Sequence, residues 1–145
     1  EAVLDADGLN AFEGLYGELR MLSKDRSIIL SPHSGELKRL TGVETPTVPD
    51  ERADTLRKLV VDSDITIVHK GAPTVVASPG GRIDVNAHGH PGLATAGSGD
   101  VLTGAIAATI SKPSRYCAIR ASNSSNRAPR SKRSGSELPL PCPNG

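Results

Sequence analysis

The sequence predicts an α/β fold, and three observations support this class. Short apolar runs that suit buried strands alternate with amphipathic stretches that suit helices, which is the pattern of a sheet covered by helices. Glycine and proline mark most of the boundaries between them. Polar segments follow directly after the apolar runs, and the carboxyl ends of parallel strands are where α/β proteins place their ligand-binding loops.

The first half of the domain contains two predicted strands. Residues 2–5 (AVLD) predict a short strand that enters an acidic loop, and residues 10–22 predict a weak helix. Residues 27–30 are a second apolar run that suits a strand. Proline and glycine then mark a turn, after which a helix is expected over residues 36–41, ending at Gly42.

The second half begins with the strongest helix pattern, in residues 48–64, for which Asp50 can serve as the cap. Residues 65–71 (ITIVHKG) predict a strand that ends at a lysine and a glycine. A hairpin follows over residues 74–86, with a turn at Pro79–Arg82. A glycine-rich loop then leads into an apolar helix over residues 101–110.

Charge divides the chain into two predicted segments. Residues 1–110 carry ten Lys/Arg and fifteen Asp/Glu, whereas residues 111–145 carry seven Lys/Arg and one Glu. We therefore expect a domain over residues 1–110 and a basic, aperiodic tail over residues 111–145, disordered or produced by a frameshift. We favour a frameshifted or mis-joined translation over a flexible tail. A nucleic-acid-binding arm is less favoured, because basic disordered segments are common without that role.

The sequence also indicates where the protein is located in the cell and whether its domain is complete. No apolar run approaches the length of a membrane-spanning helix, and both cysteines lie in the basic tail, so the sequence predicts a cytoplasmic protein with no membrane partner. The chain opens on a strand without an initiator methionine, so we expect the N-terminal part of the domain to be missing and the chain alone to be inactive. The sequence leaves a homo-oligomer open.

The most informative motif is GHPGLATAGSGDVLTGAIAATI at residues 89–110. Gly97 and Gly99 precede a predicted helix, where free backbone N–H groups favour an anion such as phosphate. The dinucleotide fingerprint is not met because Leu102 occupies its third glycine position, and the Gly-Lys-Ser/Thr of a P-loop is absent. Asp100 can be a helix cap, a metal contact or a base.

Four further side chains are candidates that their local pattern leaves open. Lys70 can hold a phosphate or be a solvated lysine at a strand end. His33 can donate to a ligand or brace a turn. Asp5 and Asp7 lie in a loop whose oxygens suit Mg²⁺ through water, although Asx-rich turns use the same residues without a metal.

Taken together, four segments resemble one enzyme family. LDADGLN, LSPHSGELKRLTG, KGAPTVV and GHPGLATAGSGDVLTGAIA are similar, in order and in wording, to segments of the ADP/ATP-dependent NAD(P)H-hydrate dehydratases of the ribokinase-like superfamily. The resemblance covers about residues 2–110, and its last motif is highly specific. It implies a three-layer ribokinase-like fold, of which this chain holds the C-terminal part.

The resemblance also implies an activity, namely the nucleotide-dependent dehydration of hydrated NADH or NADPH. ADP or ATP would be the co-substrate, with Mg²⁺. A ribokinase-like kinase for a small molecule is the alternative enzyme, and an inactive fragment of such an enzyme is the alternative from another class. The implied site residues are Asp100 as the base; His33 and Asp100 for the hydrated cofactor; Lys70, Gly71, Ala72, Pro73 and Thr74 for the nucleotide; and the N–H groups of Ala96, Gly97, Ser98 and Gly99 as the anion hole.

Overall fold

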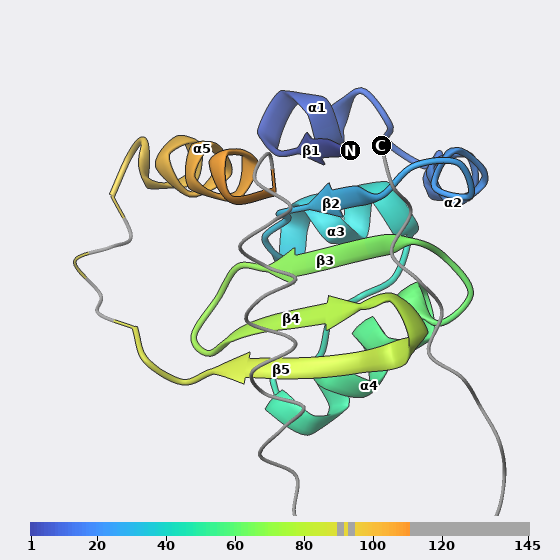
Figure 1. Cartoon of the computed structure of the whole chain (residues 1–145). Helices are drawn as coiled ribbons and strands as arrows, with labels where there is room; N and C mark the ends of the chain where they lie inside the picture. Colours follow the sequence, from blue (N-terminus) through green and yellow to red (C-terminus); the bar gives the residue numbers. More distant parts are fainter. Residues whose placement is uncertain (90–91, 93–94, 111–145) are drawn as a thin grey trace, which may run out of the picture. The chain divides into compact units, whose positions relative to one another are not determined.

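The computed structural model describes residues 1–89, 92 and 95–110, so the predictions for the tail at residues 111–145 lie outside the described residues. Strands and helices alternate at first, and a hairpin and a final helix follow (Figure 1). In chain order the elements are β1 (Ala2–Leu4), α1 (Ala6–Asn10), α2 (Tyr16–Leu22), β2 (Ile28–Leu30), α3 (Ser34–Thr41), α4 (Pro49–Val60), β3 (Ile65–His69), β4 (Thr74–Ser78), the 3₁₀ turn η1 (Pro79–Gly81), β5 (Arg82–Asn86) and α5 (Ser98–Ile110).

One five-stranded sheet in the order β1-β2-β3-β4-β5 organises the described residues (Figure 1). The pairs β1–β2 and β2–β3 are parallel, whereas β3–β4 and β4–β5 are antiparallel. The predicted strands and the predicted hairpin are therefore confirmed, and the class is a mixed α/β fold. Because β1, β2 and β3 are parallel, the segments that follow them leave the sheet at the same edge.

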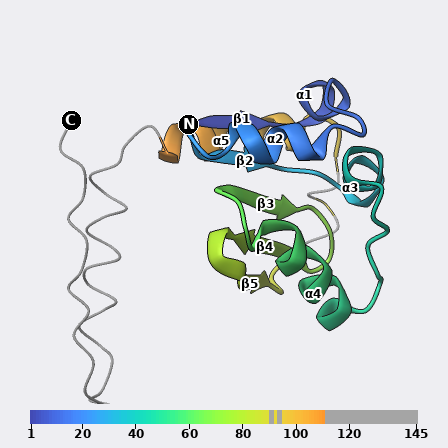
Figure 2. The same cartoon turned by 90° about the vertical axis from the view of Figure 1, so that its right-hand side faces the viewer.

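The hydrophobic core lies between one face of this sheet and helices α1–α4, and Figure 2 shows α3 and α4 together on one side of the strands. Two successive crossovers in the same direction along a sheet place their helices on one face, because such connections are right-handed. The strand side chains in the core alternate with half-buried ones, as a pleated sheet requires. The core strand residues are Ile28, Leu30, Ile65, Ile67, Val75 and Ala77, and the core helix residues are Leu9, Tyr16, Leu19, Leu37, Leu40, Leu56 and Val60.

The opposite face of the sheet is only half-buried among the described residues. Its side chains are mostly apolar and β-branched, as suits a strand that is covered on both faces. Helix α5 packs beside β1 at the edge of the sheet and buries none of its own residues completely. A full second layer of helices, as in the implied three-layer fold, stays a prediction. The half-buried residues are Val3, Ile29, Thr66, Val68 and Val76.

Several helix boundaries differ from those that the sequence predicts. The segment after β1, which the sequence predicts as an acidic loop, instead forms helix α1. The helix expected over residues 10–22 begins only at Tyr16, after a connection in which Gly14 adopts a positive φ of 71°. The helix expected over residues 36–41 begins two residues earlier, at Ser34. Helix α4 starts at Pro49, whose fixed φ suits the first helical position, so Asp50 lies in the first turn and is not the cap. Helix α5 starts at Ser98, which places Asp100 in its first turn and excludes the role of helix cap.

Helix α3 ends where the sequence predicts. Gly42 follows its last residue in the left-handed conformation, with φ 72°, and its N–H donates to the carbonyl of Lys38. None of the helices in the described ranges is both long enough and apolar enough to cross a membrane. The cytoplasmic location stays a prediction.

Candidate functional site

The carboxyl ends of β1, β2 and β3 bring three predicted segments together, as the sequence analysis expects. Asp5 follows β1, Ser31–His33 follow β2, and Lys70 follows β3. Backbone hydrogen bonds join the three segments: the N–H of Ser31 donates to the carbonyl of Leu4 at 3.1 Å, and the N–H of Lys70 donates to the carbonyl of Pro32 at 2.8 Å. The loops therefore form one continuous edge.

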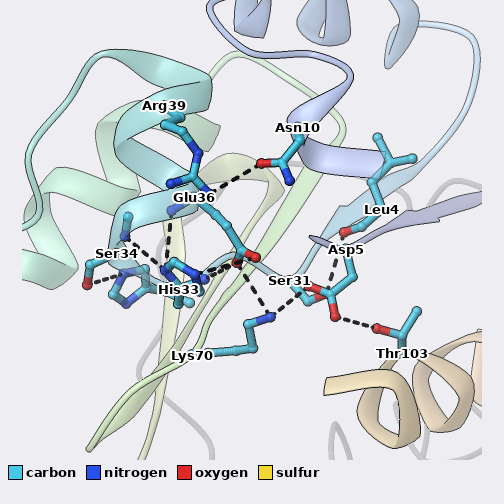
Figure 3. Close-up of polar contacts among 12 residues, drawn as sticks. Leu4, Asp5, Asn10, Ser31, His33, Ser34, Glu36, Arg39, Lys70 and Thr103 are labelled. Atoms are coloured by element: carbon cyan, nitrogen blue, oxygen red, sulfur yellow. Dashed lines mark hydrogen bonds and ion pairs between the residues drawn. The ribbon is translucent and has the colours of Figure 1, made fainter. Parts of the chain in front are cut away.

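An ion pair between Asp5 and Lys70 lies at the centre of this edge (Figure 3). Lys70 Nζ is 2.7 Å from Asp5 Oδ1, and the hydroxyl of Thr103 donates to Asp5 Oδ2 at 2.9 Å. Burial alone would raise the pKa of Asp5, but the hydrogen bonds from Lys70 and Thr103 and the charge of Lys70 hold that pKa below its usual value of 3.8. Asp5 is thus an anion whose two oxygens are both engaged, and it ties β1 to both β3 and α5.

Glu36 links Lys70 to His33 from the first turn of α3. Its side chain is nearly buried; Oε2 accepts the backbone N–H of His33 at 2.8 Å and lies 3.5 Å from Lys70 Nζ. In return, His33 Nδ1 accepts the N–H groups of Gly35 and Glu36, which completes a capping box at the start of α3 (Figure 3).

The capping role leaves His33 available for a ligand. Because Nδ1 accepts hydrogen bonds, the neutral ring carries its proton on Nε2. About half of the side chain is exposed, and Nε2 lies 3.5 Å from Glu36 Oε1. His33 therefore braces the turn and still presents a donor, so the two alternatives from the sequence are compatible.

The glycine-rich loop reaches the same edge through α5. A Cβ built on Gly99 would lie 3.4 Å from Asp5 Oδ2 and 3.9 Å from Lys70 Nζ, so the start of α5 is packed against the ion pair. Gly97 adopts a φ of 84°, and the N–H of Ser98 donates to the carbonyl of Thr95, which leaves that donor engaged. Gly99 lies in the first turn, where a helix provides its N–H with no internal acceptor.

The remaining predicted residues are placed less closely together. Asp100 is exposed in the first turn of α5, where a carboxylate is favoured by the helix dipole. Asp7 is exposed on α1 and is not a member of the ion pair that Asp5 forms with Lys70. Within residues 1–89 and the described part of the glycine loop and α5, no three His, Cys, Asp or Glu side chains are grouped as a metal site.

Two buried residues beside the site were not predicted as site residues from the sequence. His69 lies within β3, and its Nε2 is 3.3 Å from Ser34 Oγ. Burial, with smaller contributions from the charges of Arg52 and His33, lowers the pKa of His69 to about 4, so the ring is neutral at pH 7. The second buried residue is Arg52 on α4. Because Arg52 lies four residues before the buried Leu56, on the same face of the helix, this spacing could have indicated that Arg52 is buried.

The amino-acid sequence matches known proteins over most of its length. The family model for NAD(P)H-hydrate dehydratase matches residues 1–133, which extends past the expected boundary at residue 110. The bifunctional NAD(P)H-hydrate repair enzyme Nnr of Moorella thermoacetica is 44% identical over 107 residues, which are 73% of this chain and 20% of that protein. The ADP-dependent (S)-NAD(P)H-hydrate dehydratase of Neisseria meningitidis is 43% identical over 111 residues, 76% of this chain and 37% of that enzyme.

Among solved structures, one similar chain is the ADP/ATP-dependent NAD(P)H-hydrate dehydratase of Bacillus subtilis co-crystallised with ATP and Mg²⁺ and soaked with CoA. It is 39% identical, with a TM-score of 0.49, over 55% of this chain and 29% of that one. The chain thus spans well under half the length of the relatives that it matches. Since the family model covers more than nine-tenths of its residues, the chain belongs to the NAD(P)H-hydrate dehydratase family.

Proposed function

We propose that this protein dehydrates hydrated NADH or NADPH and consumes ADP or ATP in doing so. The observation that carries the proposal is the position of Gly99 beside Lys70, because it brings the glycine-rich loop to the segment that begins with Lys70. A helix N-terminus next to a lysine suits the phosphates of a nucleotide. The relatives from Neisseria meningitidis and Bacillus subtilis, named as ADP- and ADP/ATP-dependent dehydratases, support the same reaction.

Each predicted residue then has a role at this edge. Lys70 and the segment Gly71–Thr74 bind the nucleotide, while the N–H groups of residues 96–99 hold the phosphoryl group that is transferred. The N–H of Ser98 would have to leave the carbonyl of Thr95 in order to take part. Lys70 has three N–H donors, and its contacts with Asp5 and Glu36 leave one for a phosphate oxygen. The Nε2–H of His33 donates to the hydrated cofactor.

Asp100 acts as the base in the proposed reaction. It accepts the proton of the ring hydroxyl while that oxygen attacks the terminal phosphorus, which forms one P–O bond and breaks the bond to the departing nucleotide. The C–O bond then breaks, phosphate leaves with the bonding electrons, and loss of a neighbouring ring proton restores the double bond of the reduced nicotinamide. The anion hole stabilises the charge that develops on the phosphoryl oxygens.

The predicted magnesium site includes Asp5, whose two oxygens each accept one hydrogen bond, from Lys70 and from Thr103. The ammonium of Lys70, 2.7 Å from Oδ1, repels a cation at this carboxylate, so these residues do not fit a metal bound directly by Asp5. A Mg²⁺ ion that is held by nucleotide phosphates and by water needs at most one or two carboxylates. A contact from Asp5 or Asp7 through water stays a prediction, and no step above passes through the metal.

A chimera tests the proposal most sharply. The segment of the Neisseria meningitidis dehydratase that aligns with this chain is replaced by residues 1–110, and hydrated NADH is supplied with ADP or ATP. We expect the near-ultraviolet absorbance of reduced nicotinamide to return, with one phosphate released per molecule repaired. The 145-residue chain alone is the matched control, and we expect no turnover from it.

Two results would contradict the proposal. A folded chimera that binds ADP but yields no reduced nicotinamide would show that this segment does not support the reaction. Accumulation of a phosphorylated small molecule, with no reduced nicotinamide formed, would favour the kinase alternative instead. Mass spectrometry of the reaction mixture distinguishes the two products.

A further inference from the structure

Arg52 is a buried cation that forms hydrogen bonds with backbone carbonyl groups. Arg52 is only 8% exposed, and its guanidinium donates to three carbonyl groups that belong to two separate loops. Nε donates to the carbonyl of Pro46 at 3.2 Å and Nη2 to that of Thr47 at 2.9 Å. Nη1 donates to the carbonyl of Pro73 at 3.1 Å. One side chain of α4 thereby joins the segment before the helix to the segment after β3.

The charge of Arg52 makes this arrangement costly. Within residues 1–89, 92 and 95–110, no acidic side chain forms an ion pair with its guanidinium. Burial of a charge without a counter-ion is unfavourable, and hydrogen bonds offset only part of the penalty. A methionine at position 52 would fill similar space without that penalty. Compared with methionine, arginine at this position therefore contributes order to the two loops, because its planar guanidinium fixes three carbonyl groups at once.

The Pro73 carbonyl belongs to the segment Gly71–Thr74, which directly follows Lys70. Arg52 Nη1 also lies 3.4 Å from a Cβ built on Gly71, so the guanidinium packs against this segment at two places. The hydroxyl of Thr74 donates to the carbonyl of Gly71 at 3.0 Å and closes the loop on itself. Asp5 and Glu36 restrain the start of the same loop through Lys70.

We propose that Arg52 is a positioning residue for the nucleotide: it holds Gly71–Thr74 in the conformation that binds ADP or ATP and does not itself touch the ligand. This inference rests on the proposed function for the identity of the ligand, but not for the ordering of the loop. A loop that is already ordered binds more tightly, because less conformational entropy is lost on binding.

The test compares two arginines of the same helix in the full 145-residue chain and in the chimera. Arg52→Met removes all three hydrogen bonds and keeps an apolar stem. Arg57→Met is the matched control, since Arg57 Nε also donates to a backbone carbonyl, that of Gly81, in the turn before β5. Amide hydrogen exchange is measured at Gly71, Ala72 and Thr74, and ADP and hydrated NADH affinities are measured by calorimetry well below the unfolding temperature.

For Arg52→Met we expect faster exchange confined to residues 71–74 and the adjoining loop at 46–47. We also expect ADP affinity about tenfold weaker and hydrated NADH affinity nearly unchanged. Arg57→Met should leave residues 71–74 and both affinities as in the unmodified protein. Arg52→Lys should restore little, because an ammonium cannot reach the three carbonyls as a fork does.

Three results would overturn the inference. The first is exchange at residues 71–74 that is unchanged in Arg52→Met, or raised equally throughout the sheet. The second is an equal loss of ADP and hydrated NADH affinity, and the third is full recovery by Arg52→Lys. If the unmodified chimera binds no ADP, the proposed function fails, and the exchange comparison alone then decides whether Arg52 orders the loop.

Discussion

Lys70 Nζ lies 2.7 Å from Asp5 Oδ1, across 65 residues of sequence, and this contact joins the ends of β1 and β3. The second oxygen of the same carboxylate accepts the hydroxyl of Thr103 on α5. A single aspartate therefore sets the distance between the loop that starts with Lys70 and the helix that carries Asp100 (Figure 3).

Replacement of that aspartate should lower stability. Asp5→Asn keeps the shape but offers one oxygen where the native carboxylate offers two, so either Lys70 or Thr103 loses its acceptor. We expect a loss of about 1–3 kcal/mol in the free energy of unfolding, measured by denaturant titration. Asp84→Asn is the control, because its pair with Arg82 is exposed to solvent and should contribute far less to stability. An equal effect of the two substitutions would contradict this account of Asp5.

Lys70→Ala should weaken nucleotide binding selectively. Removal of one charge-assisted contact to a phosphate costs about 1.5–3 kcal/mol, so ADP affinity should fall by roughly ten- to a hundredfold, while hydrated NADH affinity changes less. Isothermal titration of each ligand measures the two effects. Lys58→Ala, on the exposed side of α4, should change neither. Equal effects on both ligands would make Lys70 a structural lysine.

Glu36→Gln should affect both ligands, in contrast to Lys70→Ala. The amide can still accept the N–H of His33, but the charge that faces Lys70 and the His33 ring is lost. We expect the affinities for ADP and for hydrated NADH to fall together by about tenfold in the same titrations. Glu44→Gln removes the exposed partner of Lys38 and should leave both affinities unaltered. A change confined to one ligand would refute the linking role of Glu36.

His69 should make stability depend on pH between 6.5 and about 4. Its folded pKa of about 4 lies below the ordinary value of 6.5, so in this range the unfolded chain binds a proton that the folded chain excludes. Stability should therefore fall as the pH falls through this window, by about 3 kcal/mol in all, and be insensitive to this group above pH 6.5. Unfolding by urea at several pH values measures the slope.

The control for His69 is the exposed histidine of the same chain, His88. His69→Leu should lose that component of the slope, whereas His88→Gln should keep it. A slope that is the same in His69→Leu and in the unmodified protein would show that His69 is not the responsible group.

The strands and the convergence of the loops could be predicted from the sequence, because both depend on local patterns. Runs such as ITIVH are apolar and β-branched, and the order of strands and helices places their carboxyl ends together. The capping role of His33 could also have been predicted from the sequence, because Glu36 follows it at the spacing of a capping box.

The contacts of Arg52 and Asp5 could not be predicted in the same way, because their partners are distant in the sequence. Arg52 is a charged residue in an amphipathic helix, and only the folded loops show that three carbonyls meet its guanidinium. Asp5 resembles a metal ligand in its local sequence, and the fold instead supplies Lys70 and Thr103. The start of α5 was misplaced for a different reason, since glycines lower helix propensity although a first turn tolerates them.

The measurement that tests the proposed reaction most directly is the turnover of Asp100→Asn in the chimera. Asparagine keeps the shape of the side chain in the first turn of α5 but cannot accept the hydroxyl proton. A positioned base contributes about 100- to 10,000-fold to a rate, so we predict a loss of that size with the unfolding temperature and ADP affinity nearly retained. Turnover close to that of the unmodified chimera would contradict the assignment of Asp100 as the base.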